Sequence, residues 1–170
     1  MEAHMRRLNT EALAKERLEE AMKELDVAEV FLREGLTRNA AGKAFQAWKA
    51  FLSYLALRNV NLLQEKYRGN KRVGNVAISF HEWMAAVVPA NKMTELSAEM
   101  ERVAPPGVAE LTAMALQLHE YQYNGPDPEG IRSKIPNDET AIALIRSFII
   151  KARALMNALS KGSNYIHTSD

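Results

Sequence analysis

The chain has 170 residues, the length of a single domain, and its 47% hydrophobic and 25% charged residues are the proportions of a globular protein. These values exclude a collagen and a disordered chain. The absence of cysteine excludes disulfides, zinc ribbons and cysteine nucleophiles. With a net charge of +1, the chain as a whole is neither an acidic nor a basic binder.

The first predicted element is a long amphipathic helix over residues 10–34. Apolar side chains recur along it at steps of three and four residues, from Leu18 to Leu32, and Gly35 is placed to end it. No apolar segment follows Arg6 and Arg7, so we expect no secretory signal. We therefore expect a cytoplasmic protein.

A second helix is predicted over residues 39–67, and a loop over residues 68–78 follows it. Apolar side chains occupy more than one face of this helix: Trp48, Phe51, Leu52, Tyr54 and Leu55. Such residues need cover, which a second protomer would supply.

The remainder of the chain predicts shorter helices and one more long helix. Ser79 and Glu82 form a capping box that opens a helix ending near Val88. Further helices are expected over residues 91–103, 106–124 and 137–162, with Pro106 in a first turn and a polar loop over residues 126–136.

Long helices joined by short turns predict an all-α fold, an up-and-down antiparallel bundle of about five to six helices. The sequence has no strand alternation, no internal repeat and no apolar stretch near the roughly 18 residues of a membrane span. We expect one domain over residues 10–162, with a flexible N-terminus over 1–9 and a flexible tail over 163–170.

Charge is distributed unevenly along the chain. Residues 37–76 carry a net charge of +7, whereas residues 1–36 and residues 77–170 each carry −3. Four cations without an acid fall within seven residues: Lys66, Arg68, Lys71 and Arg72. We interpret the Arg38–Arg72 region as the electrostatic footprint of a nucleic-acid contact, with these four cations as the predicted contacts. Pairing with the acidic first helix is the alternative, and it explains these four least.

Familiar catalytic and metal motifs are absent from the sequence. A zinc protease helix needs His-Glu-x-x-His, but Ala85 and Tyr123 stand where the second histidine would be. The Gly69–Gly74 spacing resembles a phosphate loop, but Asn75 and Val76 follow it instead of Lys and Ser or Thr. We expect no metal and no cofactor.

Polar and aromatic residues crowd the end of the predicted helix over 106–124. His119 and Tyr123 are four residues apart and share a face, and Tyr121 and Asn124 lie beside them. A structural role for these four residues and a ligand-binding site at the end of the bundle are both open, with His119 as the candidate catalytic residue.

Two segments resemble a known family. Residues 41–50, with the sequence AGKAFQAWKA, resemble the second helix of HEPN-like proteins of the archaeal PaREP group. Residues 118–123, with the sequence LHEYQY, resemble the Leu-His-x-x-x-Tyr segment of that group, and the final amphipathic helix fits the same layout. The resemblance covers residues 10–160.

The resemblance implies a small helical bundle that pairs as a homodimer. Some HEPN-like members are metal-independent ribonucleases, toxins among them, so a partner protein of the toxin–antitoxin type is one expectation. Other members bind RNA or nucleotides without catalysis. The ribonuclease signature places an arginine a few residues before the histidine on one helix.

This chain departs from that signature. Thr112, Ala113 and Met114 stand where His119 would need the arginine, and only Arg146 or Arg153 of another helix remains as a substitute. We therefore expect a binding or regulatory module for RNA or a nucleotide that is not an enzyme. The alternatives are a ribonuclease with a rearranged site around His119 and a purely structural protein–protein interaction module.

Overall fold

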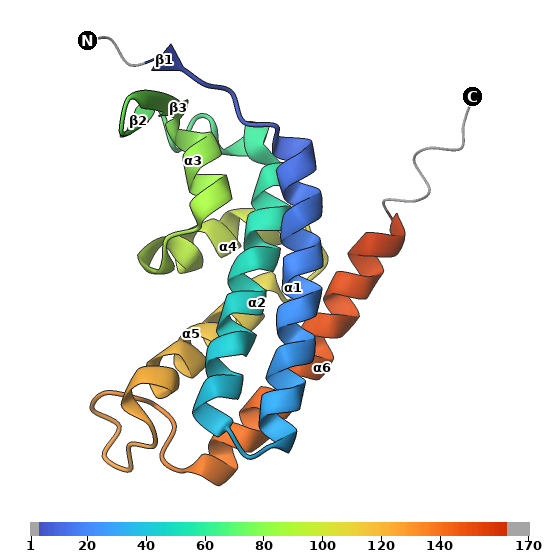
Figure 1. Ribbon diagram of the computed structural model, residues 1–170, viewed down its shortest axis with the longest axis vertical. Helices are drawn as coiled ribbons and strands as arrows, with labels where there is room; N and C mark the ends of the chain where they lie inside the picture. The colour runs from blue at the N-terminus through green and yellow to red at the C-terminus, as the bar shows by residue number, and fades with distance from the viewer. Residues whose placement is uncertain (1–3, 163–170) are drawn as a thin grey trace.

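The structure, a computed structural model, describes residues 4–162. Within this range it has six α-helices and one three-stranded sheet (Figure 1). The helices are α1 (Thr10–Arg33), α2 (Thr37–Arg58), α3 (Phe80–Val87), α4 (Met93–Glu101), α5 (Val108–Asn124) and α6 (Asp138–Gly162). The strands are β1 (His4–Met5), β2 (Asn70–Val73) and β3 (Val76–Ser79). The predicted helical bundle is confirmed, while the predicted tail over residues 163–170 lies outside the described residues.

Helices α1 and α2 form the long antiparallel pair that the sequence predicts (Figure 1). Asn9 opens α1, since its side-chain oxygen accepts a hydrogen bond from the Ala12 amide at 3.1 Å. The turn that follows α1 passes through Gly35 with φ of 74°, a left-handed conformation that favours glycine. The predicted end of the first helix is therefore confirmed.

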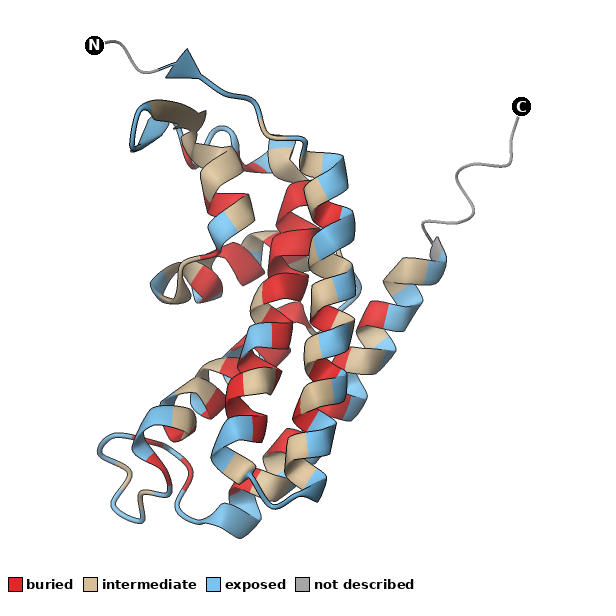
Figure 2. Cartoon of the chain, in the orientation of Figure 1, coloured by how far each residue is buried: buried red, intermediate tan, exposed pale blue. Residues whose placement is uncertain are grey.

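Helix α2 is the centre of the molecule, with 15 of its 22 residues buried (Figure 2). It packs against α1, α3, α4, α5 and α6. Many of the buried residues are small, which lets the neighbouring backbones approach closely: Ala40, Ala41, Gly42, Ala44, Ala47, Ala50 and Ala56.

The apolar faces of α2 are covered within one chain. Phe51 and Trp48 have no exposed surface, and Tyr54 is only 8% exposed. The inference that these faces need a second protomer is therefore wrong, because helices from both halves of the chain enclose α2.

The largest buried side chain, Trp48, joins α2 to α5 through a hydrogen bond. Its indole Nε1 donates to the Thr112 hydroxyl at 2.7 Å, and that hydroxyl in turn donates to the Val108 carbonyl at 2.8 Å. The Phe148 ring of α6 meets the indole edge-on at a centroid distance of 5.9 Å. One residue thus connects three helices.

Helix α2 ends at Arg58, nine residues before the predicted end at Tyr67. The side-chain amide of Asn59 donates to the Leu55 carbonyl at 2.8 Å, and a short 3₁₀ turn over Val60–Leu63 follows. Asparagine side chains compete for backbone groups in this way, which favours a helix end.

The predicted loop over residues 68–78 is wrong, because most of it forms a β-hairpin. β2 and β3 pair antiparallel from Asn70 opposite Ser79 to Val73 opposite Val76, around a two-residue Gly74–Asn75 turn. Gly74 has φ of 62°, as tight hairpin turns require. β1 adds parallel to β3, which places His4–Met5, part of the predicted flexible N-terminus, in the sheet.

The short helices differ in how their ends are formed. α3 begins at Phe80 as predicted, but the Ser79 side chain makes no capping hydrogen bond because Ser79 is the last residue of β3. α5 begins at Val108 rather than Pro106. The Glu101 carboxylate at the end of α4 accepts hydrogen bonds from the Gly107 and Ala109 amides at 2.9 and 2.8 Å. These amides lower the pKa of Glu101.

The last helix begins as predicted at the Asn137 cap, whose side-chain oxygen accepts a hydrogen bond from the Thr140 amide at 2.8 Å.

None of the helices between residues 4 and 162 combines the length and the apolar character that a membrane crossing requires.

We predict that Thr112→Val lowers the free energy of unfolding by about 1–3 kcal/mol, because it leaves the buried Trp48 N–H without an acceptor. Urea denaturation measures this loss. In a Trp48→Phe background, which lacks the indole N–H, the same change should cost at least about 1 kcal/mol less. Equal costs in the two backgrounds would contradict the hydrogen bond as the cause.

Candidate functional site

His119, the candidate catalytic residue, lies half-buried on α5 between two aromatic rings. Its imidazole stacks on Phe45 of α2 with a centroid distance of 3.9 Å, and the Tyr123 ring meets it edge-on at 5.1 Å. We call these three side chains the aromatic shelf. The imidazole Nδ1 is buried and has no hydrogen-bond partner among the described residues.

The surroundings of His119 favour its neutral form. Burial lowers its pKa below the usual value of 6.5, and the positive charge of Lys49 adds to that effect. Gln122 and Glu120 act in the opposite direction without reversing it. A neutral imidazole at physiological pH is therefore the expected state.

The other three predicted ligand-binding residues have different environments. The Tyr123 side chain is 67% exposed, so it is free to meet a ligand. Tyr121 has no exposed surface, and its hydroxyl donates to Asp138 of α6 at 2.5 Å, so a ligand contact there is excluded. Burial and the Asp138 carboxylate raise the pKa of Tyr121.

Asn124 and Asp127 organise the loop between α5 and α6. The Asn124 side-chain amide donates to the Glu120 carbonyl at 2.9 Å and to the Arg132 carbonyl at 3.0 Å. The Asp127 carboxylate accepts hydrogen bonds from four backbone amides, those of Glu129, Gly130, Arg132 and Ser133, which lower its pKa. Asn124 therefore has a structural role.

Arg38, part of the predicted basic region but not one of the predicted site residues, holds the end of α5 against α2. Its guanidinium donates to the Gln122 and Tyr123 carbonyls at 2.9 and 2.5 Å. A cation at a helix C-terminus is favourable for the helix dipole. The Gln122 side chain packs so close to Gly42 that an added Cβ there would lie 2.6 Å from it. Arg38 and Gly42 thus fix the position of the aromatic shelf.

Lys49 is a second cation of the predicted basic region that the sequence did not single out as a site residue. It follows Phe45 by one helical turn and lies close enough to His119 to lower the pKa of the imidazole. Lys43, on the same helix, pairs with Glu24 of α1 at 2.8 Å, whereas neither Lys49 nor Arg38 forms an ion pair within the described residues. The sequence signal for Lys49 was its spacing of four residues from Phe45, which places both side chains on the same face of the helix.

Neither arginine proposed as a substitute for the missing signature residue reaches His119. Arg153 pairs with Asp26 and Glu29 of α1 at 2.8 and 3.2 Å. Arg146 lies with Leu32 on the α1–α6 face. Between residues 4 and 162, no arginine side chain hydrogen-bonds the His119 imidazole.

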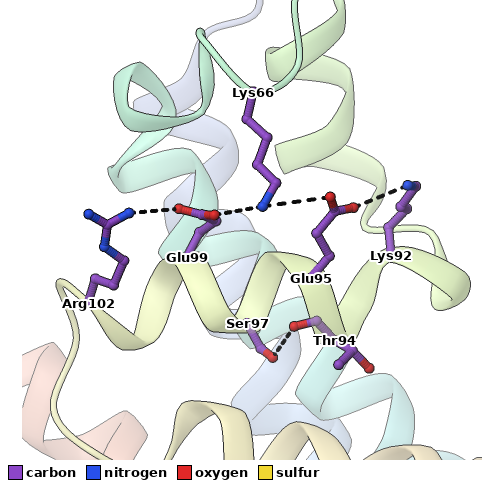
Figure 3. A network of polar contacts seen from close by, with 7 residues as sticks. All are labelled: Lys66, Lys92, Thr94, Glu95, Ser97, Glu99 and Arg102. Carbon is purple, nitrogen blue, oxygen red and sulfur yellow. Dashed lines mark hydrogen bonds and ion pairs between the residues drawn. The ribbon is translucent and has the colours of Figure 1, made fainter.

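Lys66, the first of the four predicted nucleic-acid contacts, is engaged by α4 (Figure 3). Its Nζ lies 2.6 Å from Glu99 and 3.6 Å from Glu95. The hydrogen bond to Glu99 raises the pKa of Lys66, and the same bond lowers the pKa of Glu99. Glu99 also pairs with Arg102, and Glu95 with Lys92. Charge counting along the loop missed these acids because they lie on α4.

The other three predicted nucleic-acid contacts lie in the hairpin or directly before it. None of these cations forms an ion pair in the described part of the chain. Arg68 donates to the Glu65 carbonyl at 3.1 Å, and Arg72 donates to the Gly74 carbonyl at 3.2 Å. Lys71 lies over the Trp83 ring with its Nζ 4.9 Å from the centroid. These residues keep their charge available to a ligand.

The hairpin cations and the aromatic shelf form two separate surfaces. Figure 1 places β2 and β3 at one end of the bundle and the C-terminal end of α5 at the other. No cluster of three or more His, Asp or Glu side chains suited to a metal ion occurs among the described residues.

These features define a helical-bundle protein with an aromatic and basic surface on its central helix. The model of the archaeal PaREP1/PaREP8 family matches residues 16–146, which include Phe45, His119 and Tyr123. The chain therefore belongs to the archaeal PaREP1/PaREP8 family. No curated protein and no solved structure matches it significantly.

We predict that the His119 imidazole titrates with a midpoint below 6.5, measured by NMR. Phe45→Ala should raise the midpoint, because it removes the ring that shields the imidazole from water. A midpoint at or above 6.5 in the wild-type protein would contradict the burial.

The same pKa has a consequence for stability. Because the unfolded chain binds this proton more tightly than the folded chain, the free energy of unfolding should fall as the pH drops through 6.5 toward the folded pKa. His119→Gln should show a smaller fall over that range.

Proposed function

We propose that this protein is a HEPN-like module that binds RNA or a nucleotide through the aromatic shelf and does not cleave it. The observation that carries the proposal is the exposed Tyr123 ring, held against His119 beside the cations Arg38 and Lys49. The resemblance of residues 41–50 and 118–123 supports the HEPN-like part of the proposal. We also propose a cytoplasmic location, where RNA and nucleotides are available.

Stacking on an aromatic ring is the usual way in which proteins bind unpaired bases. Tyr123 offers a largely exposed ring whose edge contact with His119 restricts its motion. Lys49 supplies a positive charge that acts on His119, the residue against which the Tyr123 ring packs. An aromatic platform with a cation beside it suits single-stranded RNA and free nucleotides alike.

Cleavage of RNA needs a proton donor and a cation that stabilises the charge developing on phosphate. A lowered pKa makes His119 a poor donor at neutral pH, and Arg38 already binds two carbonyls of α5. Both observations favour binding without catalysis over the alternative, a ribonuclease with a rearranged site around His119.

The hairpin cations Arg68, Lys71 and Arg72 are proposed as a second, electrostatic contact for longer RNA. Lys66 contributes less than the sequence suggested, since Glu99 and Glu95 already offset its charge. A strand that extends from the shelf along the bundle would reach this second surface.

We predict that the two surfaces respond differently to mutation in binding titrations with a labelled single-stranded RNA. Tyr123→Ala should weaken binding about tenfold, since stacking of one base contributes about 1–3 kcal/mol, and leave the salt dependence unchanged. Replacing Arg68, Lys71 and Arg72 together with Ala should flatten the log–log salt slope by about 2, because each phosphate contact to a single strand contributes about 0.7.

A matched triple variant of Lys92, Arg102 and Lys151 provides the control, since each of these cations already has a carboxylate partner. The same RNA should remain intact on incubation with the wild-type protein. Metal-independent cleavage that is lost in His119→Ala would establish the ribonuclease instead. An absence of RNA and nucleotide binding at low salt would favour the protein–protein interaction module.

We further propose that the protein forms a homodimer, as the HEPN-like resemblance implies. We also propose that it has a partner protein of the toxin–antitoxin type. A patch on α1 and α6 is the best-placed contact, because the Ile150 side chain is 70% exposed beside a hollow that Leu32 and Ile149 line. Buried apolar surface of this kind is typical of homodimer contacts.

Sedimentation should therefore give twice the mass of one chain, and Ile150→Asp should shift the protein to monomer. Ile131→Asp is the control, because Ile131 is similarly exposed, at 74%, but lies on the loop between α5 and α6. A wild-type monomer at micromolar concentration would refute the dimer.

A further inference from the structure

A small polar hollow lies beside Lys49, between α1, α2 and the C-terminal end of α3. It has a volume of about 240 Å³. Its polar lining comes mainly from Arg17 and Glu20 of α1 and from Gln46, Lys49 and Ser53 of α2, and Ala86 of α3 closes one side. The hollow is separate from the loop between α5 and α6.

Arg17 is held in place at the wall of this hollow. Its guanidinium pairs with Glu20 at 2.7 Å and donates to the Ala86 carbonyl at 3.2 Å. Its Nε is buried and has no hydrogen-bond partner among the described residues. Ser53 contacts the same end of α3, since its hydroxyl donates to the Ala85 carbonyl at 2.7 Å and to the Ala86 carbonyl at 3.3 Å. The hollow therefore has a preorganised guanidinium at its wall.

The balance of charge in the hollow is positive. Arg17 and Lys49 are the cations, and Glu20 is the acid that offsets one of them. Because Lys49 forms no ion pair within the described residues, its ammonium group is available to an anion. An anionic group with several acceptor oxygens matches two converging cationic donors.

Lys49 also connects the hollow to the aromatic shelf. It lines the hollow, and its charge acts on His119, which stacks on Phe45. Phe45 and Lys49 are one helical turn apart, a rise of about 6 Å along α2. Lys49 and the Tyr123 ring thus both act on the His119 imidazole, one through its charge and the other through an edge contact.

We infer that the hollow binds the phosphate of a nucleotide whose base stacks on Tyr123, with Lys49 and Arg17 as the phosphate ligands. This inference rests on the proposed function and names the chemical unit that the shelf and the hollow bind together. Glu20 limits the affinity, because its carboxylate repels the phosphate.

NMR titrations with adenosine 5′-monophosphate and with adenosine test the inference. The monophosphate should bind at least about tenfold more tightly than adenosine, since only it has a group for the hollow. Lys49→Gln should reduce this ratio to near one, and Glu20→Gln should increase it. Tyr123→Ala should weaken both ligands by the same factor, because it acts on the base.

Arg58→Gln is the matched control, since it removes one exposed cation from the far end of the same helix and should leave the ratio unchanged. A tetra-adenylate without terminal phosphate separates the two sources of phosphate. If Lys49→Gln weakens the binding of tetra-adenylate, the hollow binds an internal phosphodiester of RNA. If Lys49→Gln weakens the binding of the monophosphate alone, the hollow binds the phosphate of a free nucleotide or of a 5′ end.

Equal binding of adenosine and its monophosphate, or a ratio that Lys49→Gln leaves unchanged, would overturn the inference. If RNA then still binds and depends on Tyr123, the proposed function stands without the phosphate site. If neither nucleoside, nucleotide nor RNA binds, the proposed function and the phosphate site both fail.

Discussion

The burial of α2 among five other helices is the constraint on which the rest of the structure depends. A helix buried along 15 of its 22 residues must be met by several partners, and its alanines and Gly42 let those partners come close. Alanine loses no side-chain entropy on burial, so a helix of this composition is a favourable central element. Trp48 is the largest buried side chain, and its indole N–H needs the Thr112 hydroxyl because no water reaches it.

This enclosure also decides where a ligand can meet the central helix. α3 and α5 approach α2 at different points along its length (Figure 1). Phe45 of α2 contributes to the aromatic shelf, and Lys49, one turn further along, lines the hollow. Arg38 and Gly42 bring α5 close to α2 at one end. The site is thus built on rigid helices, and its positions are set by the packing of the core.

The sequence predicted what depends on local pattern and missed what depends on distant partners. The apolar steps along α1 and the cap at Asn137 are local, and these two helices begin where the sequence places them. The end of α2 and the hairpin were also encoded locally, by Asn59 and by Gly74–Asn75 between two valines, but the helical period of the surrounding chain obscured them. By contrast, the acids that pair with Lys66 lie on α4, and Glu99 is 33 residues away from Lys66 in the sequence. Which of Tyr121 and Tyr123 is buried likewise depends on Asp138 of another helix.

The loop between α5 and α6 owes its shape to very few side chains. Asp127 gathers four backbone amides, while Ser133 and Ile135 are the buried anchors. Other side chains of the loop are exposed to solvent: Glu129, Ile131, Arg132 and Lys134. Shape and surface chemistry are therefore encoded by different residues in this segment. Substitutions at the exposed positions can change the charge and polarity beside Tyr123 without rebuilding the backbone, so a protein with this architecture can acquire a new ligand preference by altering a few loop residues.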